Sequence, residues 1–364
     1  MPVAGNEWLA VDADGHVMEG DELFTDYLDP AFRNRGMGWA ANQDGARRFF
    51  ADGIAHPPFP KEISIRKTMT AENRIKVLDQ ERIAAAVLFP SAALVAPYVG
   101  DVALGQAFVR AYNDWITDYV KPYRDRMFPV APLALADVDW AIREAKRAVK
   151  QGAVAVCVRP NPEQGRNLDD PAYDRLYAAI QDLGVPLIVH EATGAPNTVG
   201  GDRYGIHLPQ RYAFNHAISH SFEQMFAALS LICGGVLERF PRLKVGFFEA
   251  GCSWVPYWIA RLDDHFAHRI LGRYMPIKLR PSEYFERQCA VTCDPHDESV
   301  SLAVEGIGAH RILFATDYPH FDSGGNAVGK FLGVRGISAA NQRRILAENA
   351  VAFFGLDIPE FASA

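Results

Sequence analysis

The sequence predicts an α/β fold, and within that class a (β/α)8 TIM barrel. Short apolar segments of strand length recur along the chain, at residues 9–14, 84–89, 128–133, 153–158, 185–190, 244–249, 289–293 and 311–317. Amphipathic stretches of helical length separate them, and the clearest cover residues 102–120, 138–150, 172–183, 220–240, 254–271 and 296–307. Nearly continuous apolar strands are typical of parallel sheets covered on both faces. Strands of this kind alternating with helices favour a barrel over an open doubly wound sheet.

Two connections are longer than the loops that usually join a strand to a helix. Residues 17–73 follow the first strand, and residues 191–215 follow the fifth. Connections of this length commonly form lids or binding loops. Both leave from the carboxyl ends of strands, where barrel active sites assemble. We therefore expect residues 1–364 to form a single barrel domain, with long insertions after strands 1 and 5: an insertion or lid at 17–73 and an active-site loop at 191–215.

The composition indicates a soluble globular protein. Of the 364 residues, 49% are hydrophobic and 22% are charged, and the net charge is −7. Because no basic cluster occurs, neither nucleic acid nor an anionic membrane surface is an expected partner. The five cysteines are odd in number and several end strand-like segments, which favours reduced, buried thiols. The N-terminal segment MPVAGNEWLA lacks the features of a signal peptide, and no apolar stretch approaches the ~18 residues of a membrane span. We therefore expect a cytoplasmic protein.

Polar side chains gather at the carboxyl ends of the predicted strands. They are Asp14 and His16 at the first strand, Arg159 after the fourth, His190 at the fifth, Glu249 at the sixth and Asp317 at the eighth. A barrel brings these strand ends to one mouth. Convergence of imidazoles with carboxylates is how proteins build divalent metal sites. The set therefore predicts a metal site at the mouth of the barrel.

Each of these residues also has a structural interpretation. Asp12 or Asp14 could cap a turn, and a single histidine at a strand end is more often a structural residue than a ligand. Glu249 lies in the apolar run VGFFEAG, where a charge must be paired, ligated or solvated. His216 and His220 flank the start of a predicted helix in NHAISHSFEQMFAAL, and His220 could face the site. The joint occurrence of such residues at several strand ends is what favours the metal site.

Several ordered segments of the chain resemble one known family. They are VDADGH, RNLDDPAYDRLYAAIQDLGVPLIVHEATG, GGVLERFPRLKVGFFEAGCSWVPYWIARLD, FATDYPH and ILAENAVAFFGL. In these segments the sequence resembles the amidohydrolase-related (amidohydrolase 2) metal-dependent barrels grouped with aminocarboxymuconate-semialdehyde decarboxylase. The resemblance implies that Asp14, His16, His190 and Asp317 hold the metal. It also implies a homo- or hetero-oligomer with related barrels.

The chain departs from that family at two positions. The first ligand of the strand-1 pair is more often histidine in the family and is Asp14 here, which adds negative charge. At the end of the sixth strand the decarboxylases usually carry an acid/base histidine, whereas this chain has Glu249 in the sequence EAG. The second departure argues against decarboxylation by the family's usual acid and base. His320, three residues after Asp317, is expected on the rim of the site.

The first functional hypothesis is a metal-dependent enzyme that acts on a small organic substrate by hydrolysis or by carbon–carbon cleavage, including decarboxylation. A single Zn2+ or Mn2+ would activate water or polarise a carbonyl or carboxylate. Glu249, His220 and Asp317 are the candidate catalytic residues. Arg159 could bind a substrate carboxylate through a bidentate contact, or it could be a structural anchor.

Two alternatives remain open. The carboxylates and imidazoles are numerous enough for two ions of iron or manganese, with ligands drawn from Asp14, His16, His190, His220, Glu249 and Asp317. This inventory resembles the dinuclear oxygenases reported among relatives of the family. The chain could instead be a non-catalytic structural partner of a homologous subunit, because a fold alone does not fix a function.

Overall fold

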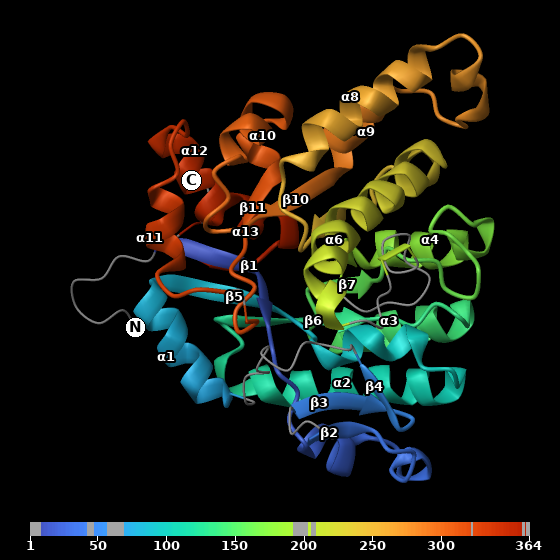
Figure 1. Cartoon of the computed structure of the whole chain (residues 1–364), viewed down its shortest axis with the longest axis vertical. Coiled ribbons are helices and arrows are strands. Elements are labelled where there is room, and N and C mark those ends of the chain that lie inside the picture. The colour runs from blue at the N-terminus through green and yellow to red at the C-terminus, as the bar shows by residue number, and fades with distance from the viewer. Residues whose placement is uncertain are drawn as a thin grey trace.

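The computed structural model describes residues 9–41, 47–56, 69–191, 203–204, 209–321, 323–358 and 361. Eight parallel strands form one sheet, in which neighbours along the chain are neighbours in space, and the sheet curls into a nearly closed barrel (Figure 1). The strands are β1 (Ala10–His16), β5 (Ile83–Phe89), β6 (Met127–Pro132), β7 (Ala155–Val158), β8 (Leu187–His190), β9 (Val245–Phe248), β10 (Cys289–Cys293) and β11 (Ile312–Phe314). Each strand falls on one of the predicted segments, so the predicted (β/α)8 fold is confirmed.

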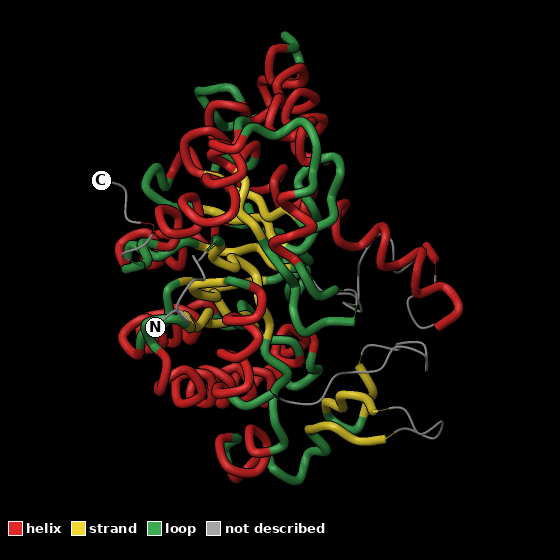
Figure 2. The backbone as a smooth tube through the Cα atoms, turned by 90° about the vertical axis from the view of Figure 1, so that its left-hand side faces the viewer, coloured by secondary structure: helices red, strands yellow, loops and turns green. Residues whose placement is uncertain are grey.

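Helices surround the strands on the outside of the barrel, as Figure 2 shows. They are α1 (Ala71–Glu81), α2 (Val102–Val120), α3 (Val138–Gln151), α4 (Asp174–Leu183), α6 (Tyr212–Ala228), α7 (Val236–Arg239), α8 (Trp254–Ala267), α9 (Pro281–Gln288), α10 (Val300–Ile307), α11 (Ala327–Leu332), α12 (Ala339–Arg343) and α13 (Asn349–Phe354). Shorter turns extend some of them, such as Leu229–Cys233 after α6. The order of strands and helices is that of a parallel barrel.

Local rules set the ends of the helices that the sequence predicts best. The side chains of Asp101 and Asp137 accept hydrogen bonds from backbone N–H groups in the first turns of α2 and α3, which satisfies donors that a helix leaves free. Gly152 caps the C-terminus of α3, and its φ of 113° is accessible to glycine at little steric cost. The predicted helices at 102–120 and 138–150 therefore agree closely with α2 and α3.

The apolar core has two layers, one inside the barrel and one between the strands and helices. The inner layer includes Val11, Ala13, Val87, Val130, Ile188 and Leu313. Phe354, Leu356 and Phe361 of the C-terminal segment pack with this inner layer, together with Ala84 and Phe128 near the starts of their strands. The C-terminal segment therefore occupies the amino ends of the strands, and the carboxyl ends are left for a ligand site.

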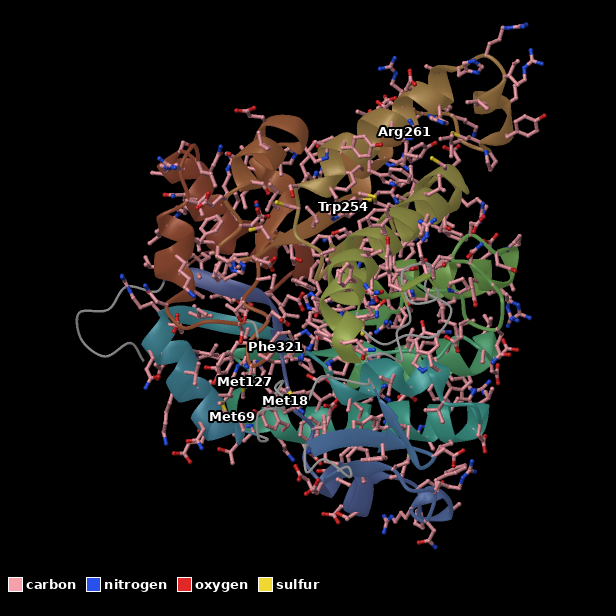
Figure 3. All side chains as sticks on the ribbon, in the orientation of Figure 1. Met18, Met69, Met127, Trp254, Arg261 and Phe321 are labelled. Carbon is pink, nitrogen blue, oxygen red and sulfur yellow. The ribbon has the colours of Figure 1, made fainter. Side chains whose placement is uncertain are left out.

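The outer layer packs the helices onto the strands. In Figure 3 the indole of Trp254 lies at the start of α8, and its ring meets that of Phe247 in β9 edge-on, with 6.0 Å between the ring centres. The five cysteines are buried and form no disulfide, in keeping with the reduced thiols that the sequence predicts. Within the described ranges, no helix has the length and apolar character needed to cross a membrane.

A small antiparallel sheet in the first long connection was not predicted. It comprises β2 (Gly38–Ala41), β3 (Arg47–Ala51) and β4 (Ile54–His56). Phe49 of β3 stacks on Phe108 of α2 with 5.4 Å between ring centres, so this sheet is anchored to the barrel wall. Strands of this length carry too few residues for a periodic pattern. Residues 57–68 and most of 192–208 lie outside the described residues, and the division of the chain into a lid at 17–73 and a loop at 191–215 stays a prediction.

The structure corrects the predicted helix at 220–240. α6 begins at Tyr212, so His216 and His220 lie inside the helix and do not flank its start. No side chain caps the N-terminus of α6 at Arg211, which explains why the sequence carries no start signal there. The segment also does not continue to residue 240 as one helix, because Gly235 adopts a left-handed φ of 79° before α7.

Candidate metal centre and active site

A bulge at the end of β1 directs two acidic residues to opposite sides of the strand. The pairing of β1 with β5 shifts register between Asp12 and Gly15, and a bulge of this kind changes the direction of the side chains that follow. A Cβ atom on Gly15 would point at Asp12 and Arg74 of α1, outside the barrel. Asp14 and His16 instead reach His190 across the mouth.

Asp12 has a structural role, because it ties β1 to the segment after β11. Its carboxylate accepts hydrogen bonds from the N–H of Thr316 at 2.9 Å and from the hydroxyl of Thr316 at 2.6 Å. The buried guanidinium of Arg74 lies 3.7 Å from Asp12 and donates to the carbonyls of His16 and Tyr318 at 3.1 and 2.9 Å. This network holds the backbone of both strand ends that supply site residues.

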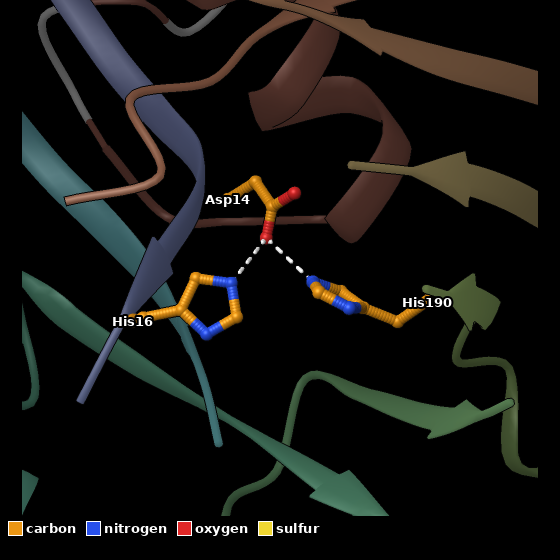
Figure 4. Close-up of side chains that lie close together, drawn as sticks. All are labelled: Asp14, His16 and His190. Atoms are coloured by element: carbon orange, nitrogen blue, oxygen red, sulfur yellow. Dashed lines mark hydrogen bonds and ion pairs between the residues drawn. The ribbon is translucent and has the colours of Figure 1, made fainter. Parts of the chain in front are cut away.

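Three buried side chains meet at one point in the mouth (Figure 4). Oδ1 of Asp14 lies 3.1 Å from Nε2 of His190 and 3.5 Å from Nε2 of His16. Asp317 adds a fourth ligand atom, because its Oδ1 lies 3.4 Å from Nε2 of His16. The structure therefore brings together the four residues that the resemblance implies as ligands.

Backbone carbonyls orient both histidines for metal binding. Nδ1 of His16 lies 2.8 Å from the carbonyl oxygen of Pro90, and Nδ1 of His190 lies 2.7 Å from that of Glu191. Because a carbonyl accepts only, both Nδ1 atoms carry the proton, and Nε2 is left to offer its lone pair in the neutral ring. Burial, reinforced by His320, lowers the pKa of His16 to about 4, so this imidazole is neutral.

The geometry and the charges fit a divalent cation. Nε2 of His16 is buried and forms no hydrogen bond with any described residue. It faces carboxylate oxygens of Asp14, Asp317 and Glu249 at 3.5, 3.4 and 3.8 Å. Ligand atoms held about 2.1 Å from one ion are about 3.0–3.4 Å apart in octahedral or tetrahedral geometry. Lone pairs and carboxylates that converge at such distances need a positive charge between them.

Glu249 and His220 form a second pair beside these ligands. Oε1 of Glu249 lies 3.6 Å from Nε2 of His220, and Oε2 lies 3.2 Å from Nδ1 of His190. Burial opposes the charge on both partners, but their attraction outweighs it: the pKa of Glu249 is held well below its usual range, and that of His220 is raised. The contact therefore favours the charged forms of both side chains.

His320 lies deeper in the site than the sequence indicates. Its Nδ1 lies 2.6 Å from Oδ1 of Asp317, and its Nε2 lies 2.8 Å from the hydroxyl of Ser91. His16, Asp317 and His320 make a second group with metal-ligand spacing, which shares His16 with the first. The spacing of three residues between Asp317 and His320 in DYPH was the available signal.

Two site residues adopt a backbone conformation that non-glycine residues rarely take. Glu249 has φ of 60° and Asp317 has φ of 54°. Such strain persists where the surroundings fix the backbone, and it clusters at functional sites. Here the N–H of Asp317 donates to the carbonyl of Asp14 at 2.9 Å, and the N–H of Glu249 donates to the hydroxyl of Thr292 at 3.2 Å.

Arg159 lies behind the ligands in a buried ion pair. Its Nη2 is 3.2 Å from Oε1 of Glu191 and 3.2 Å from Oδ1 of Asn161. Its guanidinium also lies over the ring of Tyr98, 5.6 Å from the ring centre. The pair with Glu191 already occupies one edge of the guanidinium, and the role of Arg159 toward a substrate carboxylate stays a prediction.

A cavity of about 300 Å³ opens beside the ligands. Its lining includes His220, Glu249, Asp294, His296, Asp317 and Lys330. The sequence prediction missed Asp294, although it follows the last residue of β10 and so obeys the same strand-end rule. Burial raises the pKa of Asp294 to about 6. The cavity has the size and polarity of a site for one small molecule.

The barrel and its mouth define a metal-dependent enzyme of the hydrolase or carboxy-lyase kind. Comparison with known protein families supports this class of enzyme: the family model described as amidohydrolase matches residues 11–356 of the chain. The chain belongs to this amidohydrolase family, which confirms the resemblance drawn from the sequence motifs. An enzyme rather than a non-catalytic partner subunit is therefore supported.

Similar proteins from several organisms include decarboxylases. A 2-amino-3-carboxymuconate-6-semialdehyde decarboxylase of Dictyostelium discoideum is 28% identical over 67% of this chain and 66% of its own length. A gamma-resorcylate decarboxylase of a Rhizobium species is 28% identical over 84% of this chain and 93% of its own length.

Solved structures share the fold. An amidohydrolase from Mycobacterium avium subsp. paratuberculosis superposes with a TM-score of 0.80 at 24% identity, covering 96% of this chain and 99% of that one. A dihydroxybenzoic acid decarboxylase from a Polaromonas species, solved with bound manganese and 2-nitroresorcinol, superposes with a TM-score of 0.70 at 21% identity, covering 97% and 98%.

Proposed function

We propose that the chain is a decarboxylase of a small aromatic acid that depends on one divalent ion, with manganese as the first candidate. The observation that carries the proposal is the convergence of Asp14, His16, His190 and Asp317 beside a cavity of single-ring size. The decarboxylases named above support the reaction, and the manganese in the Polaromonas enzyme supports the choice of ion.

The four residues would hold the ion, which supplies a Lewis acid for a carboxylate or phenolate oxygen of the substrate. The protein itself must then supply a proton. When the bond between ring and carboxylate breaks and carbon dioxide leaves, the ring carbon takes up one proton. A positioned imidazolium is the usual source of such a proton.

His220 provides that imidazolium and so replaces the histidine that β9 lacks. It projects from α6, and its Nδ1 lies 2.9 Å from the carbonyl oxygen of His216, which directs Nε2 toward Glu249. The carboxylate of Glu249, at the end of β9, stabilises the charged ring. An imidazole from a helix and a carboxylate from a strand thus supply the acid that a strand histidine would supply alone.

The reaction itself is tested with manganese-loaded protein and a panel of hydroxybenzoates. We expect stoichiometric formation of carbon dioxide and the ring product, measured by isotope release from carboxyl-labelled substrates and by chromatography. A parallel panel of aryl esters and amides measures the competing hydrolase hypothesis. Turnover of esters or amides without carbon dioxide release from any acid would overturn the proposal.

The proton-transfer roles are tested with Glu249→Gln and His220→Gln. Removing a general acid costs about 10²–10⁴ in rate, so each variant should lose at least 100-fold in kcat while keeping its metal. His265→Gln, on α8, is the matched control and should leave kcat unchanged, because among the described residues the imidazole of His265 hydrogen-bonds to the carbonyl of Arg261 in its own helix. Loss of the ion from Glu249→Gln would instead make Glu249 a ligand.

A dinuclear oxygenase is the second candidate, because the mouth holds more carboxylates and imidazoles than one ion needs. His16, Asp317 and His320 form a further group with metal-ligand spacing, which shares His16 and Asp317 with the proposed ligands of the single ion. Elemental analysis after growth with iron, manganese and zinc, without chelator, separates the two candidates. About one ion per chain agrees with the decarboxylase; two ions per chain including iron, with oxygen consumption under reducing conditions, would favour the oxygenase.

Assembly with a second barrel also belongs to this proposal. α6 and α8 are neighbours, since the indole of Trp258 donates to the carbonyl of Met225 at 2.9 Å. Phe222, Phe226 and Tyr257 on their outer faces are 48%, 38% and 63% exposed. Exposed apolar clusters of this kind are typical of interaction surfaces, and light scattering after size-exclusion chromatography measures the state of assembly.

A further inference from the structure

The cavity beside the ligands contains a lysine that the proposed reaction does not use. Lys330 of α11 lines this cavity together with Glu249, His220 and Asp317. Of the four proposed ligands, Asp317 lines this cavity, so a ring whose carboxylate binds at the metal would extend into a volume that also meets Lys330. A cavity of about 300 Å³ is at the lower end of the range for small-molecule pockets, about 300–1,000 Å³.

No acidic side chain in the described part of the chain forms an ion pair with Lys330. Other lysines do have such partners: Lys76 lies 2.9 Å from Glu72, and Lys278 lies 2.8 Å from Glu238. The ammonium group of Lys330 instead lies against Gly324, where an added Cβ atom would be 2.4 Å from Nζ. The absence of a side chain at position 324 therefore leaves the room that this ammonium group occupies.

The N-terminus of α11, the helix that carries Lys330, is held by a carboxylate of α1. The carboxylate of Glu81, at the end of α1, accepts hydrogen bonds from the N–H groups of Asn326 and Ala327 at 2.8 and 2.7 Å. These are the first backbone donors of α11, and a carboxylate there is favourable because of the helix dipole. α11 is thus held in place by its first turn, while Lys330 in its second turn faces the cavity.

We infer that Lys330 binds a second carboxylate of the substrate, so that the enzyme acts on single-ring dicarboxylates in preference to monocarboxylates. The inference rests on the proposed function, in which the first carboxylate lies at the metal. A lysine that forms no ion pair with a described acidic residue offers a compact positive charge and three donors to a carboxylate. Because Lys330 is exposed at the cavity mouth, water weakens the contact, and the expected effect is moderate.

The test measures binding to manganese-loaded protein by isothermal titration. The probes are benzoate and the 1,2-, 1,3- and 1,4-isomers of benzenedicarboxylate, whose second carboxylates lie at different distances from the first. We expect one isomer to bind at least fivefold more tightly than benzoate. Lys330→Met should lower the affinity for that isomer at least fivefold and the affinity for benzoate less than twofold, and Lys330→Arg should restore most of the preference.

Lys150→Met is the matched control, because Lys150 is an exposed lysine in the last turn of α3, at the outer face of the barrel. It should leave all four affinities unchanged. The inference is wrong if no isomer binds better than benzoate, or if Lys330→Met lowers all affinities equally or none. Failure of the proposed function can be distinguished from failure of the inference. A Lys330-dependent preference for a dicarboxylate without carbon dioxide release would overturn the proposed decarboxylase alone. Carbon dioxide release with a preference that Lys330→Met does not change would overturn the inference alone.

Discussion

Position 15 requires a residue without a side chain, because Asp12 and Arg74 occupy the space that a side chain would need. A Cβ atom there would lie 2.5 Å from Nη2 of Arg74 and 2.6 Å from Oδ2 of Asp12. Both atoms belong to the buried network that holds the carbonyl of His16. The polar residues of the motif DADGH thus have distinct roles: Asp12 ties β1 to the segment after β11, Gly15 leaves room for this contact, and Asp14 and His16 are proposed metal ligands.

We predict that Gly15→Ala destabilises the fold and weakens metal binding together. Overpacking a buried contact costs about 1–3 kcal/mol, and the displaced Arg74 would release the carbonyl of His16. The measurements are the free energy of unfolding in urea and manganese titration at equilibrium. Gly100→Ala is the control, because an added Cβ atom there meets nothing within 4 Å. Equal stability and affinity in both variants would contradict the role given to Gly15.

Glu163 gives a prediction about pH. Its buried carboxylate accepts hydrogen bonds from the N–H groups of Leu135 and Ala136 at 2.8 and 2.7 Å, yet burial raises its pKa to about 7. The folded state therefore favours the protonated form, and this contribution is complete below the unfolded pKa near 4.5. It is lost as the pH rises through about 7, by an amount on the order of 3 kcal/mol.

Glu163→Gln removes this pH dependence because an amide does not ionise. The difference in unfolding free energy between wild type and variant should therefore be more favourable to wild type at pH 5 than at pH 8. Glu144→Gln is the control, because the pKa of Glu144 shifts in the opposite direction: Arg147 and Asn113 outweigh burial and lower it. The stability that the Glu144 carboxylate contributes is therefore lost only when the pH falls through its lowered pKa in the folded state. A difference for Glu163→Gln that stays constant from pH 5 to pH 8 would refute the assignment.

At the scale of elements, the barrel closes between β1 and β11 with few backbone contacts. His16 donates to the carbonyl of Tyr318 at 2.8 Å, and Asp317 donates to that of Asp14 at 2.9 Å. Side chains complete the closure, since the hydroxyl of Thr316 donates to Asp12 and accepts from the N–H of Tyr318 at 3.1 Å. The seam and the metal site therefore share the same strand ends.

We predict that Thr316→Val weakens this seam by about 2 kcal/mol, because it removes the hydroxyl that donates to the buried Asp12 carboxylate at 2.6 Å and leaves that carboxylate oxygen without this donor. Manganese affinity should fall in parallel, as Asp317 follows directly in the chain. Thr117→Val in α2 is the control, since that hydroxyl donates to the carbonyl of Asn113 in its own helix at 2.7 Å. The measurements are urea unfolding and manganese titration of both variants. If Thr316→Val keeps the stability and manganese affinity of wild type, the backbone hydrogen bonds are sufficient to close the barrel and the prediction is wrong.

The elements that the sequence predicts are those whose signals are local. The eight barrel strands carry continuous apolar runs, and α2 and α3 have N-capping residues and amphipathic faces. The positions of these strands and helices could therefore be predicted from the sequence. The three short strands β2, β3 and β4 were missed because their pairing is set by contacts with α2 and by each other. The start of α6 was misplaced because it has no capping side chain.

The candidate site could also be predicted in part from the sequence. The sequence could place five residues at one mouth because each lies at or shortly after the carboxyl end of a strand: Asp14, His16, His190, Glu249 and Asp317. The depth of His320 and the direction of Lys330 could not be predicted, because they depend on how the segment after β11 folds back over the mouth. The partnership of His220 with Glu249 likewise depends on the packing of α6.

At the scale of the whole molecule, the metal site joins strand ends that are far apart in the sequence. Asp14 and His16 come from β1, His190 from β8 and Asp317 from the segment that follows β11. An ion bound there links both sides of the seam to the opposite wall of the barrel. Without it, carboxylates of Asp14, Asp317 and Glu249 face one buried point. Binding that is specific to the folded state should therefore stabilise the whole barrel.

We predict that chelation lowers the thermal midpoint of wild type by several degrees and that manganese restores it. An ion present at about 100 times its dissociation constant contributes about 2.7 kcal/mol. His190→Ala loses a ligand at the centre of the site, so its midpoint should not respond to chelator or manganese, while its circular dichroism stays that of the folded barrel. His265→Ala, outside the site, should respond like wild type. An equal response to manganese in His190→Ala and wild type would place the stabilising ion elsewhere, because the ion would then bind without the histidine that Asp14 contacts at 3.1 Å.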